Sequence, residues 1–538
     1  MKRYQATFLV CLLAALPATA QLAVSDVQHI IAQAVTRAKA LTGNPLATNA
    51  VIAISDREGW ILGVWAINTN LAPNDANVGN AISKAGAAAF LSSDNNAFSS
   101  RTAGFIVQQH YPPGIDNTPP GPLVGVNFSQ LAFSDINKFK GPGSRITFGS
   151  SPGTNIVATP LADTGGLAGT PGGLPLYQNG LLVGGIGVSG DGSVATDVTP
   201  SVTANPSSDE DVALAGQTGY TPANDILGSD VFVGGIRLAY VASTTSLGTV
   251  HSFTGLPGGV VMPFTITNSP APYPYPVITF GNETGQIRQP IIDDPATIPL
   301  PNSVARLSAA DVTNIIVAAA TRAYTTRAGI RLPLGQTAQV FITVVNNPNN
   351  AGSPPVVLGT FCTSSNATRF SWDVAVQKAR TAIFFSDNTR AYSARTVGFL
   401  AEEFYPPGID GTQPGIFLGL QEKFSIITPA SIAFTNPLNN AAIMTATNVD
   451  PNLPNGITIF PGGFPLYRNG VLIGAVGVSG DGVDQDDLIS ASGTVGLQPS
   501  PAIRADNFIY LGARLPYAVF PREPKLNPSE APAVDDGR

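Results

Sequence analysis

Hydrophobic residues recur in the first part of the chain at two different spacings. Within residues 26–38 they stand three and four positions apart, which is the period of an amphipathic helix. Residues 50–55 and 59–65 are shorter apolar runs joined by a polar turn, a pattern typical of two antiparallel strands. Continued along the chain, the pattern predicts a helix, two strands, two helices, a long loop, a hairpin, a helix and a strand. This order indicates the α+β class, with a central antiparallel sheet flanked by helices.

The hairpin, residues 174–192, is the most distinctive stretch of the sequence. An Asn-Gly pair at its middle suits the positive φ angles of a tight two-residue turn. In the second strand, bulky residues such as Ile186 alternate with Gly185 and Gly187, so one face is bulky and the other nearly bare. Small residues on a strand face admit a close neighbour. That neighbour is expected to be either a packed helix or a flat ligand.

The hairpin returns nearly intact at residues 464–482, where Gly477 occupies the small face. Two further pairs of segments match in the same order, residues 26–38 with 311–323 and residues 98–105 with 392–399. Self-similarity of this kind indicates two copies of one domain. We place the domains at residues 22–250 and 307–522. The Pro- and Gly-rich residues 251–306 are expected to form an extended linker over the surface, and residues 523–538 an unstructured tail.

Residues 1–20 have the features of a signal peptide, namely two basic residues, an apolar run and Ala-Thr-Ala before Gln21. We therefore expect an exported protein, periplasmic or secreted. Cys362 would be the single thiol of the mature chain, so no intrachain disulfide is expected. No later stretch is long and apolar enough to predict a transmembrane segment.

Composition excludes several classes of function. The chain has 28 Lys and Arg against 35 Asp and Glu, and its basic residues form no cluster, so nucleic acid is not an expected partner. The GxGxxG at residues 185–190 follows a hairpin turn instead of opening a βαβ unit, so it does not predict a dinucleotide site. No Cys/His metal spacing occurs, and His110 has no nearby serine or acid in the frame of a hydrolase. The acidic residues 481–487 suit either a hard cation or a helix cap, which leaves the metal question open.

Five shared features occur in the same order in both copies: the early helix, a Lys-x₅-Phe helix, an Arg-Thr helix, a Tyr-Pro-Pro-Gly-Ile loop and the Gly-rich hairpin. With them the chain resembles the GlcG/HbpS-like (DUF336-type) family. The resemblance implies tandem profilin-like domains, each with a five-stranded antiparallel sheet between helices. It also implies haem as the cofactor of some members, a connection of exported members with haem capture or degradation, and rings or larger oligomers. This chain departs from the compact family pattern by its duplication and by long insertions.

Candidate ligands of a haem iron lie at the Tyr-Pro-Pro-Gly-Ile loops. His110 immediately precedes the first loop and offers an imidazole; its counterpart is Phe404, and the alternative is a partly exposed histidine at a helix end. Tyr111 and Tyr405 occupy the same place in both copies. Their phenolates could bind ferric haem, or their rings could stack on the prolines to hold the loop.

The remaining candidates would hold the porphyrin itself. Arg101 and Arg395 could pair with haem propionates, or could satisfy internal carboxylates. The same two interpretations apply to Lys84 and Lys378. Gly185, Gly187 and Gly477 are the cofactor-facing residues if the flat ligand lies on the small face of the hairpin.

These observations favour an exported haem-binding protein, possessing a haem-capturing or haem-degrading role and able to form a homo-oligomer. The alternative is a structural or assembly module, in which two pseudo-symmetric domains pack together without a ligand. A small-molecule enzyme is a third hypothesis, but the sequence shows no group of polar residues that would form its active site. Whether the protein is an enzyme therefore stays undecided.

Overall fold

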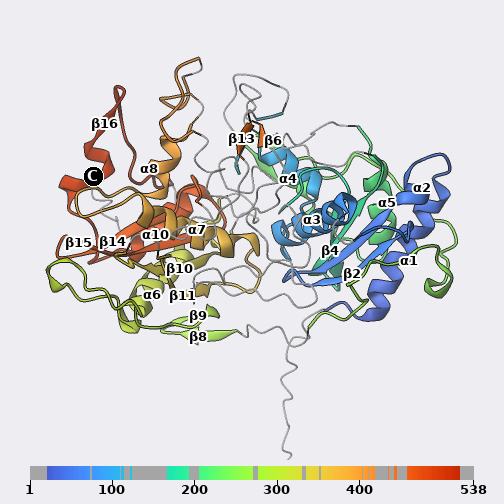
Figure 1. The fold of residues 1–538 in the computed structure, drawn as a ribbon, viewed down its shortest axis with the longest axis horizontal. Helices are drawn as coiled ribbons and strands as arrows, with labels where there is room; N and C mark the ends of the chain where they lie inside the picture. Colours follow the sequence, from blue (N-terminus) through green and yellow to red (C-terminus); the bar gives the residue numbers. More distant parts are fainter. Residues whose placement is uncertain are drawn as a thin grey trace, which may run out of the picture.

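The computed structural model shows two similar halves that follow each other along the chain and lie side by side, the first at the right of Figure 1 and the second at the left. Helices flank an antiparallel sheet in each half, which confirms the α+β class. The structure describes residues 21–72, 75–108, 111–113, 115, 121–123, 167–192, 205–270, 277–329, 332, 335–350, 353–402, 404–409, 411–418, 434–435, 442–444 and 457–521.

The first half has a five-stranded sheet in the order β3-β4-β1-β2-β7, as the family resemblance implies. Its elements follow the predicted order, with a short helix, three 3-10 turns and a second small hairpin added. They are α1 (Val24–Ala40), α2 (Leu46–Asn49), β1 (Val51–Asp56), β2 (Ile61–Ala66), α3 (Ala76–Leu91), α4 (Ser100–Ile106), β3 (Gly173–Gln178), β4 (Leu181–Ser189), α5 (Ser208–Gln217), η2 (Asn224–Ile226), η3 (Gly228–Asp230), β5 (Phe232–Val233), β6 (Ile236–Arg237), η4 (Phe253–Gly255) and β7 (Gly259–Val260).

The second half repeats this plan with a six-stranded sheet in the order β14-β15-β10-β11-β9-β8. Its elements are β8 (Ile278–Phe280), β9 (Glu283–Gln289), η5 (Pro301–Ser303), α6 (Ala309–Thr325), β10 (Phe341–Asn346), β11 (Val357–Cys362), α7 (Phe370–Phe384), α8 (Ala394–Phe399), β12 (Phe434–Thr435), β13 (Ala442–Met444), β14 (Gly463–Arg468), β15 (Val471–Ser479), α10 (Val483–Gly493), η6 (Pro501–Ile503), η7 (Ala505–Asn507), β16 (Ile509–Tyr510) and β17 (Ala513–Arg514).

Each sheet lies between two layers of helix. In the first half α3 packs on β4 and β1, whereas α1 and α5 cover the opposite face (Figure 1). In the second half α7 takes the place of α3, and α6 and α10 take the places of α1 and α5. Local sequence explains where these helices begin. Ser308 caps α6, since its hydroxyl accepts from the Asp311 backbone N–H while the Asp311 carboxylate accepts from Ser308.

The segment predicted to be a linker contributes strands to both sheets. β7 pairs with β2, and β9 pairs with both β11 and β8, so residues 259–260 and 278–289 are parts of the two sheets. The prediction of an extended linker throughout residues 251–306 is therefore wrong. The three short strands contain no proline, so the proline-rich composition of the segment as a whole did not reveal them.

A buried cluster of charge joins the two halves. Glu58, on the turn between β1 and β2, accepts from Arg288 on β9 at 2.7 Å and from Arg369 before α7 at 2.6 Å. All three residues are buried. The Arg288 guanidinium also lies over the Trp372 ring, 4.8 Å from its centroid. Glu58 thus holds one half to the other.

None of the helices within the described ranges is long and apolar enough to cross a membrane.

Candidate functional site

The small face of the hairpin is covered by a helix in both halves. The turns form as predicted, with φ of +54° at Asn179 and +77° at Gly180. A Cβ built on Gly187 would overlap the carbonyl oxygen of Ala81 on α3. The same test on Gly185 meets the carbonyl of Ala85, again in α3. The two glycines therefore allow the helix backbone to lie directly on the strand.

The second half has the same packing, since a Cβ on Gly477 would overlap the carbonyl oxygen of Ala375 on α7. Of the two neighbours that the sequence left open, the packed helix is present. A flat cofactor lying against Gly185, Gly187 and Gly477 is not compatible with this arrangement, because helix backbone occupies that space. The expectation that these three glycines face a cofactor is therefore wrong.

The two predicted arginines are paired with carboxylates of the same half, of which Glu210 and Asp487 are buried. Arg101 is buried and meets Glu210 through Nε and Nη2, at 2.7 and 3.0 Å. Glu210 also accepts from the backbone N–H groups of residues 242 and 243, at 2.9 and 2.8 Å. Arg395 pairs in the same way with Asp484 and Asp487. The interpretation as internal ion pairs accounts for both side chains.

The two lysines form a second matched pair of buried interactions. Lys84 Nζ lies 2.7 Å from Asp209 Oδ2 and donates to the carbonyl of Val188 at 2.9 Å. Lys378 Nζ lies 2.7 Å from Asp486 Oδ2 and makes the equivalent bond to β15. Burial raises the pKa of Asp209 to about 6, although the Lys84 charge acts in the opposite direction.

Sequence reasoning missed Asp209 and Glu210. They stand near the start of α5 as Asp486 and Asp487 stand near the start of α10, but an insertion separates them from the first hairpin. The pair Asp486 and Asp487 near the start of α10 was the signal in the sequence that could have identified Asp209 and Glu210 in the first half. Within the acidic residues 481–487, Asp484, Asp486 and Asp487 likewise make ion pairs with basic side chains. Among the described residues, no group of His, Cys, Asp and Glu is arranged to hold a metal ion.

Tyr111 and Tyr405 are equivalent buried side chains whose rings meet other aromatic rings. Tyr111 lies edge-on to Phe105 at a centroid distance of 5.5 Å, and Tyr405 lies at 5.5 Å from Phe399. Neither phenol oxygen has a hydrogen-bond partner within the described part of the chain. Burial raises the pKa of Tyr111 to about 12. Unpaired buried polar atoms are uncommon and indicate a missing partner. His110 lies outside the described residues, so its role remains a prediction.

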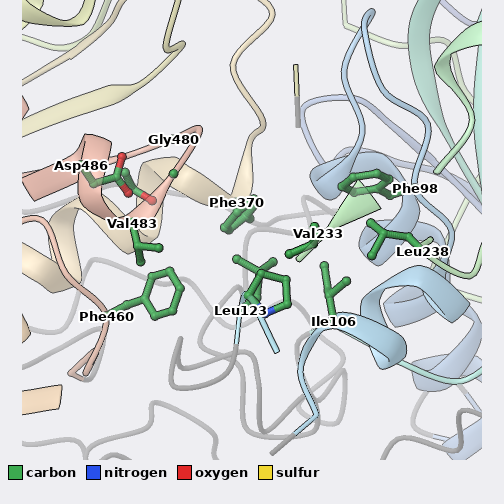
Figure 2. A pocket seen from close by; sticks show the side chains of 13 residues that line it. Phe98, Ile106, Leu123, Val233, Leu238, Phe370, Phe460, Gly480, Val483 and Asp486 are labelled. Atoms are coloured by element: carbon green, nitrogen blue, oxygen red, sulfur yellow. The ribbon is translucent and has the colours of Figure 1, made fainter. Parts of the chain in front are cut away.

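A cavity lies between the two halves (Figure 2). The first half forms one wall and the second half the other, with Leu123 and Phe370 between them. Its volume is about 480 Å³, including the part open to solvent. Apart from Asp486, whose charge is balanced by Lys378, the lining is uncharged and largely apolar. The lining residues are Phe98, Ile106, Pro122, Leu123, Val233, Leu238, Phe370, Phe460, Ser479, Gly480, Gly482, Val483 and Asp486.

Tyr111 belongs to the apolar cluster that surrounds this cavity. The cluster contains Ile106, Leu123 and Phe370 together with Tyr111, and Phe460 packs against it. The backbone explains the connection, because Leu123 N–H donates to the carbonyl of Ile106 at 3.1 Å and so brings the end of the loop back to α4. The loop that carries Tyr111 therefore begins and ends beside the cavity.

A family model described as "Haem degrading protein HbpS-like" matches this chain twice, over residues 22–204 and 336–494. The chain belongs to the HbpS-like family. The predicted family resemblance is thereby confirmed for both halves. The search of curated proteins found no match.

Two solved structures are similar to parts of this HbpS-like protein. A crystal structure of a PduOC:heme complex is 21% identical, with 36% of this chain and 96% of that chain covered and a TM-score of 0.22. The Klebsiella pneumoniae protein ORFY, of the DUF336 family model, is 20% identical, with 37% and 96% covered and a TM-score of 0.22. Each of these proteins thus spans little more than one third of the chain, about the size of one HbpS-like half.

The cavity between the HbpS-like halves was not foreseen from the sequence. Its two aromatic residues from the second half, Phe370 and Phe460, stand where the first copy has Ala76 and Thr170. Comparing the sequences of the two copies identifies the residues that they share. Phe370 and Phe460 stand at positions where the copies differ, so that comparison did not point to the cavity.

Proposed function

We propose that this HbpS-like protein binds haem, and that it does so in the cavity between its halves. The observation that carries the proposal is the family match in both halves, to a model described as a haem-degrading protein. The location follows from the cavity itself, since the small faces of the two hairpins are filled by α3 and α7.

The lining suits the flat, apolar body of a porphyrin. Phe98, Phe370 and Phe460 supply aromatic surface, and burial of apolar area contributes roughly 25 cal/mol per Å². No lining residue within the described ranges is basic, so the propionates are expected to face solvent at the open side.

Among the described residues, Tyr111 is the candidate for holding the iron. Its hydroxyl is buried and unpaired within the described part of the chain, and its ring lies in the cluster around the cavity. Bound haem would supply an iron that accepts a phenolate oxygen or an imidazole nitrogen as a ligand. His110, the preceding residue, is the alternative ligand.

A titration of the mature chain with hemin tests the proposal. We expect a shifted Soret band, and at least a tenfold loss of affinity in Val483→Trp, because Val483 lines the cavity and the larger ring would fill it. Val495→Trp is the matched control, since Val495 is 71% exposed and is not part of the lining. A spectrum identical to that of free hemin would contradict haem binding and favour the ligand-free assembly module.

The pH dependence of hemin affinity should identify the ligand. Because the pKa of Tyr111 is about 12, binding through its oxygen must release a proton, so affinity should rise up to tenfold per pH unit between pH 6 and 9. Tyr111→Phe should weaken binding and flatten this rise. Binding through His110 would instead level off above about pH 7, because an ordinary imidazole is then neutral, and would survive Tyr111→Phe.

The proposal includes export, as the features of residues 1–20 predict; these residues lie outside the described part of the chain. Sequencing the N-terminus of the extracytoplasmic protein should then find Gln21 first. A protein retaining Met1 there would contradict cleavage.

A further inference from the structure

Each half contains one lysine in a buried ion pair, and the two pairs have the same geometry. Lys84 Nζ on α3 lies 2.7 Å from Asp209, and Lys378 Nζ on α7 lies 2.7 Å from Asp486. Each ammonium also donates to a carbonyl of the neighbouring hairpin strand, at 2.9 Å in β4 and 2.8 Å in β15. All four side chains are at most 3% exposed. The ion pair is therefore a common feature of both halves.

The chain that leads into each hairpin passes directly beside the ion pair. A Cβ built on Gly462 would stand 3.1 Å from Lys378 Nζ, and one on Gly172 would stand 3.2 Å from Lys84 Nζ. Both glycines have a positive φ, of +108° and +116°. Glycine thus allows the backbone to approach the ammonium in the same way in both halves.

The halves differ two positions before this glycine. The second half has Phe460 there, whereas the first half has Thr170. Lys378 Nζ lies over the Phe460 ring, 5.7 Å from its centroid, which is within the range for attraction between a cation and an aromatic face. Threonine has no ring to offer Lys84. The ammonium of the second half therefore interacts with an aromatic ring in addition to its carboxylate.

The ion pair of the second half also borders the cavity. Asp486 and Phe460 both belong to the lining, and Figure 2 shows them in the same wall. Asp209 and Thr170 are not part of the lining. No other described residue of the lining is charged, so the balance between Asp486 and Lys378 determines the charge of this wall.

The Lys378 ammonium has two effects on the wall. It offsets the Asp486 carboxylate, which would otherwise need hydration that a flat apolar ligand displaces. It also attracts the face of the Phe460 ring, which limits the orientations of that ring. Loss of the ammonium would therefore leave a negative wall with a less ordered ring.

We propose that Lys378 is a positioning residue for the flat ligand of the cavity. It holds the Phe460 ring in the wall and keeps the wall neutral by pairing with Asp486. The inference rests on the proposed function for the identity of the ligand, haem.

Hemin titrations of Lys378→Met and Lys84→Met test this role. Each variant removes one buried ammonium and leaves one buried aspartate, so both should lower the melting temperature by a similar amount. Lys378→Met should bind hemin at least tenfold more weakly than the unchanged chain, whereas Lys84→Met should bind within twofold of it. A general loss of stability would weaken binding in both variants alike.

Two further variants separate the two effects of the ammonium. Lys378→Met/Asp486→Asn removes both charges and should recover at least threefold of the affinity lost in Lys378→Met. Phe460→Leu removes the ring. Because part of the effect passes through this ring, adding Lys378→Met to Phe460→Leu should cost at least threefold less affinity than adding it to the unchanged chain.

Titration with 1-anilinonaphthalene-8-sulfonate, an aromatic fluorescent probe without iron, distinguishes the role of Lys378 from the identity of the ligand. The part of its signal that Val483→Trp removes reports the cavity. Equal weakening of hemin binding by Lys378→Met and Lys84→Met would overturn the positioning role and leave haem binding in place. Binding of the probe but not of hemin, with Lys378→Met alone weakened, would contradict haem and support the positioning role. Binding of neither would overturn both.

Discussion

Replacing Glu58 by glutamine should lower the free energy of unfolding by about 3–5 kcal/mol. The carboxylate is the shared partner of Arg288 and Arg369, at 2.7 and 2.6 Å, and all three residues are buried. Glutamine has nearly the same shape but no charge, so both guanidinium groups would lose the negative charge of Glu58 in a buried environment. Chemical denaturation with urea, monitored by fluorescence, measures the loss.

Asp230→Asn is the control for Glu58→Gln. Asp230 pairs with Arg237 at 3.8 Å on the surface, where both side chains are at least half exposed, so the loss should be close to zero. Since Glu58 belongs to the first half and both arginines to the second, the Glu58 variant should also become more sensitive to proteases within residues 251–306. Equal stability of the two variants would show that the charge cluster does not hold the halves together.

Replacing Gly187 by alanine should destabilise the first half by about 3 kcal/mol. The added methyl group would overlap the carbonyl oxygen of Ala81, which is helix backbone and cannot turn away as a side chain could. Either α3 must leave the sheet or the strand must shift, and both expose apolar surface. Gly477→Ala should act in the same way on the second half, through the carbonyl of Ala375.

Gly248→Ala is the matched control, because a Cβ there meets nothing within 4 Å. Its melting temperature, measured by calorimetry, should remain that of the unchanged chain. If Gly187→Ala melted at the same temperature as Gly248→Ala, then α3 would not lie on the small face of β4, and that face would again be open to a flat ligand.

The comparison of the hairpins shows what local sequence can predict. The turn at Asn179 and Gly180, the alternation of large and small residues and the repetition of the stretch all depend on neighbours in the chain, and the structure agrees with each. The identity of the partner on the small face depends on the fold, because any close neighbour requires the same glycines. The sequence therefore left two possible neighbours of the small face, a packed helix or a flat ligand. The tertiary packing shows that it is the helix.

Other features could not be predicted from the sequence, because they depend on residues that are far apart along the chain. The partners of Arg101 and Arg395 follow an insertion of different length in each copy, so their spacing gave no common signal. The cavity needs residues such as Phe98 and Phe460, which lie far apart in the sequence and in different halves. The strands within residues 251–306 form because the main-chain groups of a neighbouring strand accept any compatible backbone, whatever its side chains.

The most direct test of the account is to locate iron in crystals grown with hemin, by anomalous diffraction at the iron absorption edge. The account predicts one iron per chain, between the halves, beside the cavity lined by Phe370 and Phe460 and within reach of Tyr111 or His110. An iron on the hairpin side of α3 or α7, or crystals of the hemin-treated protein without iron, would contradict it.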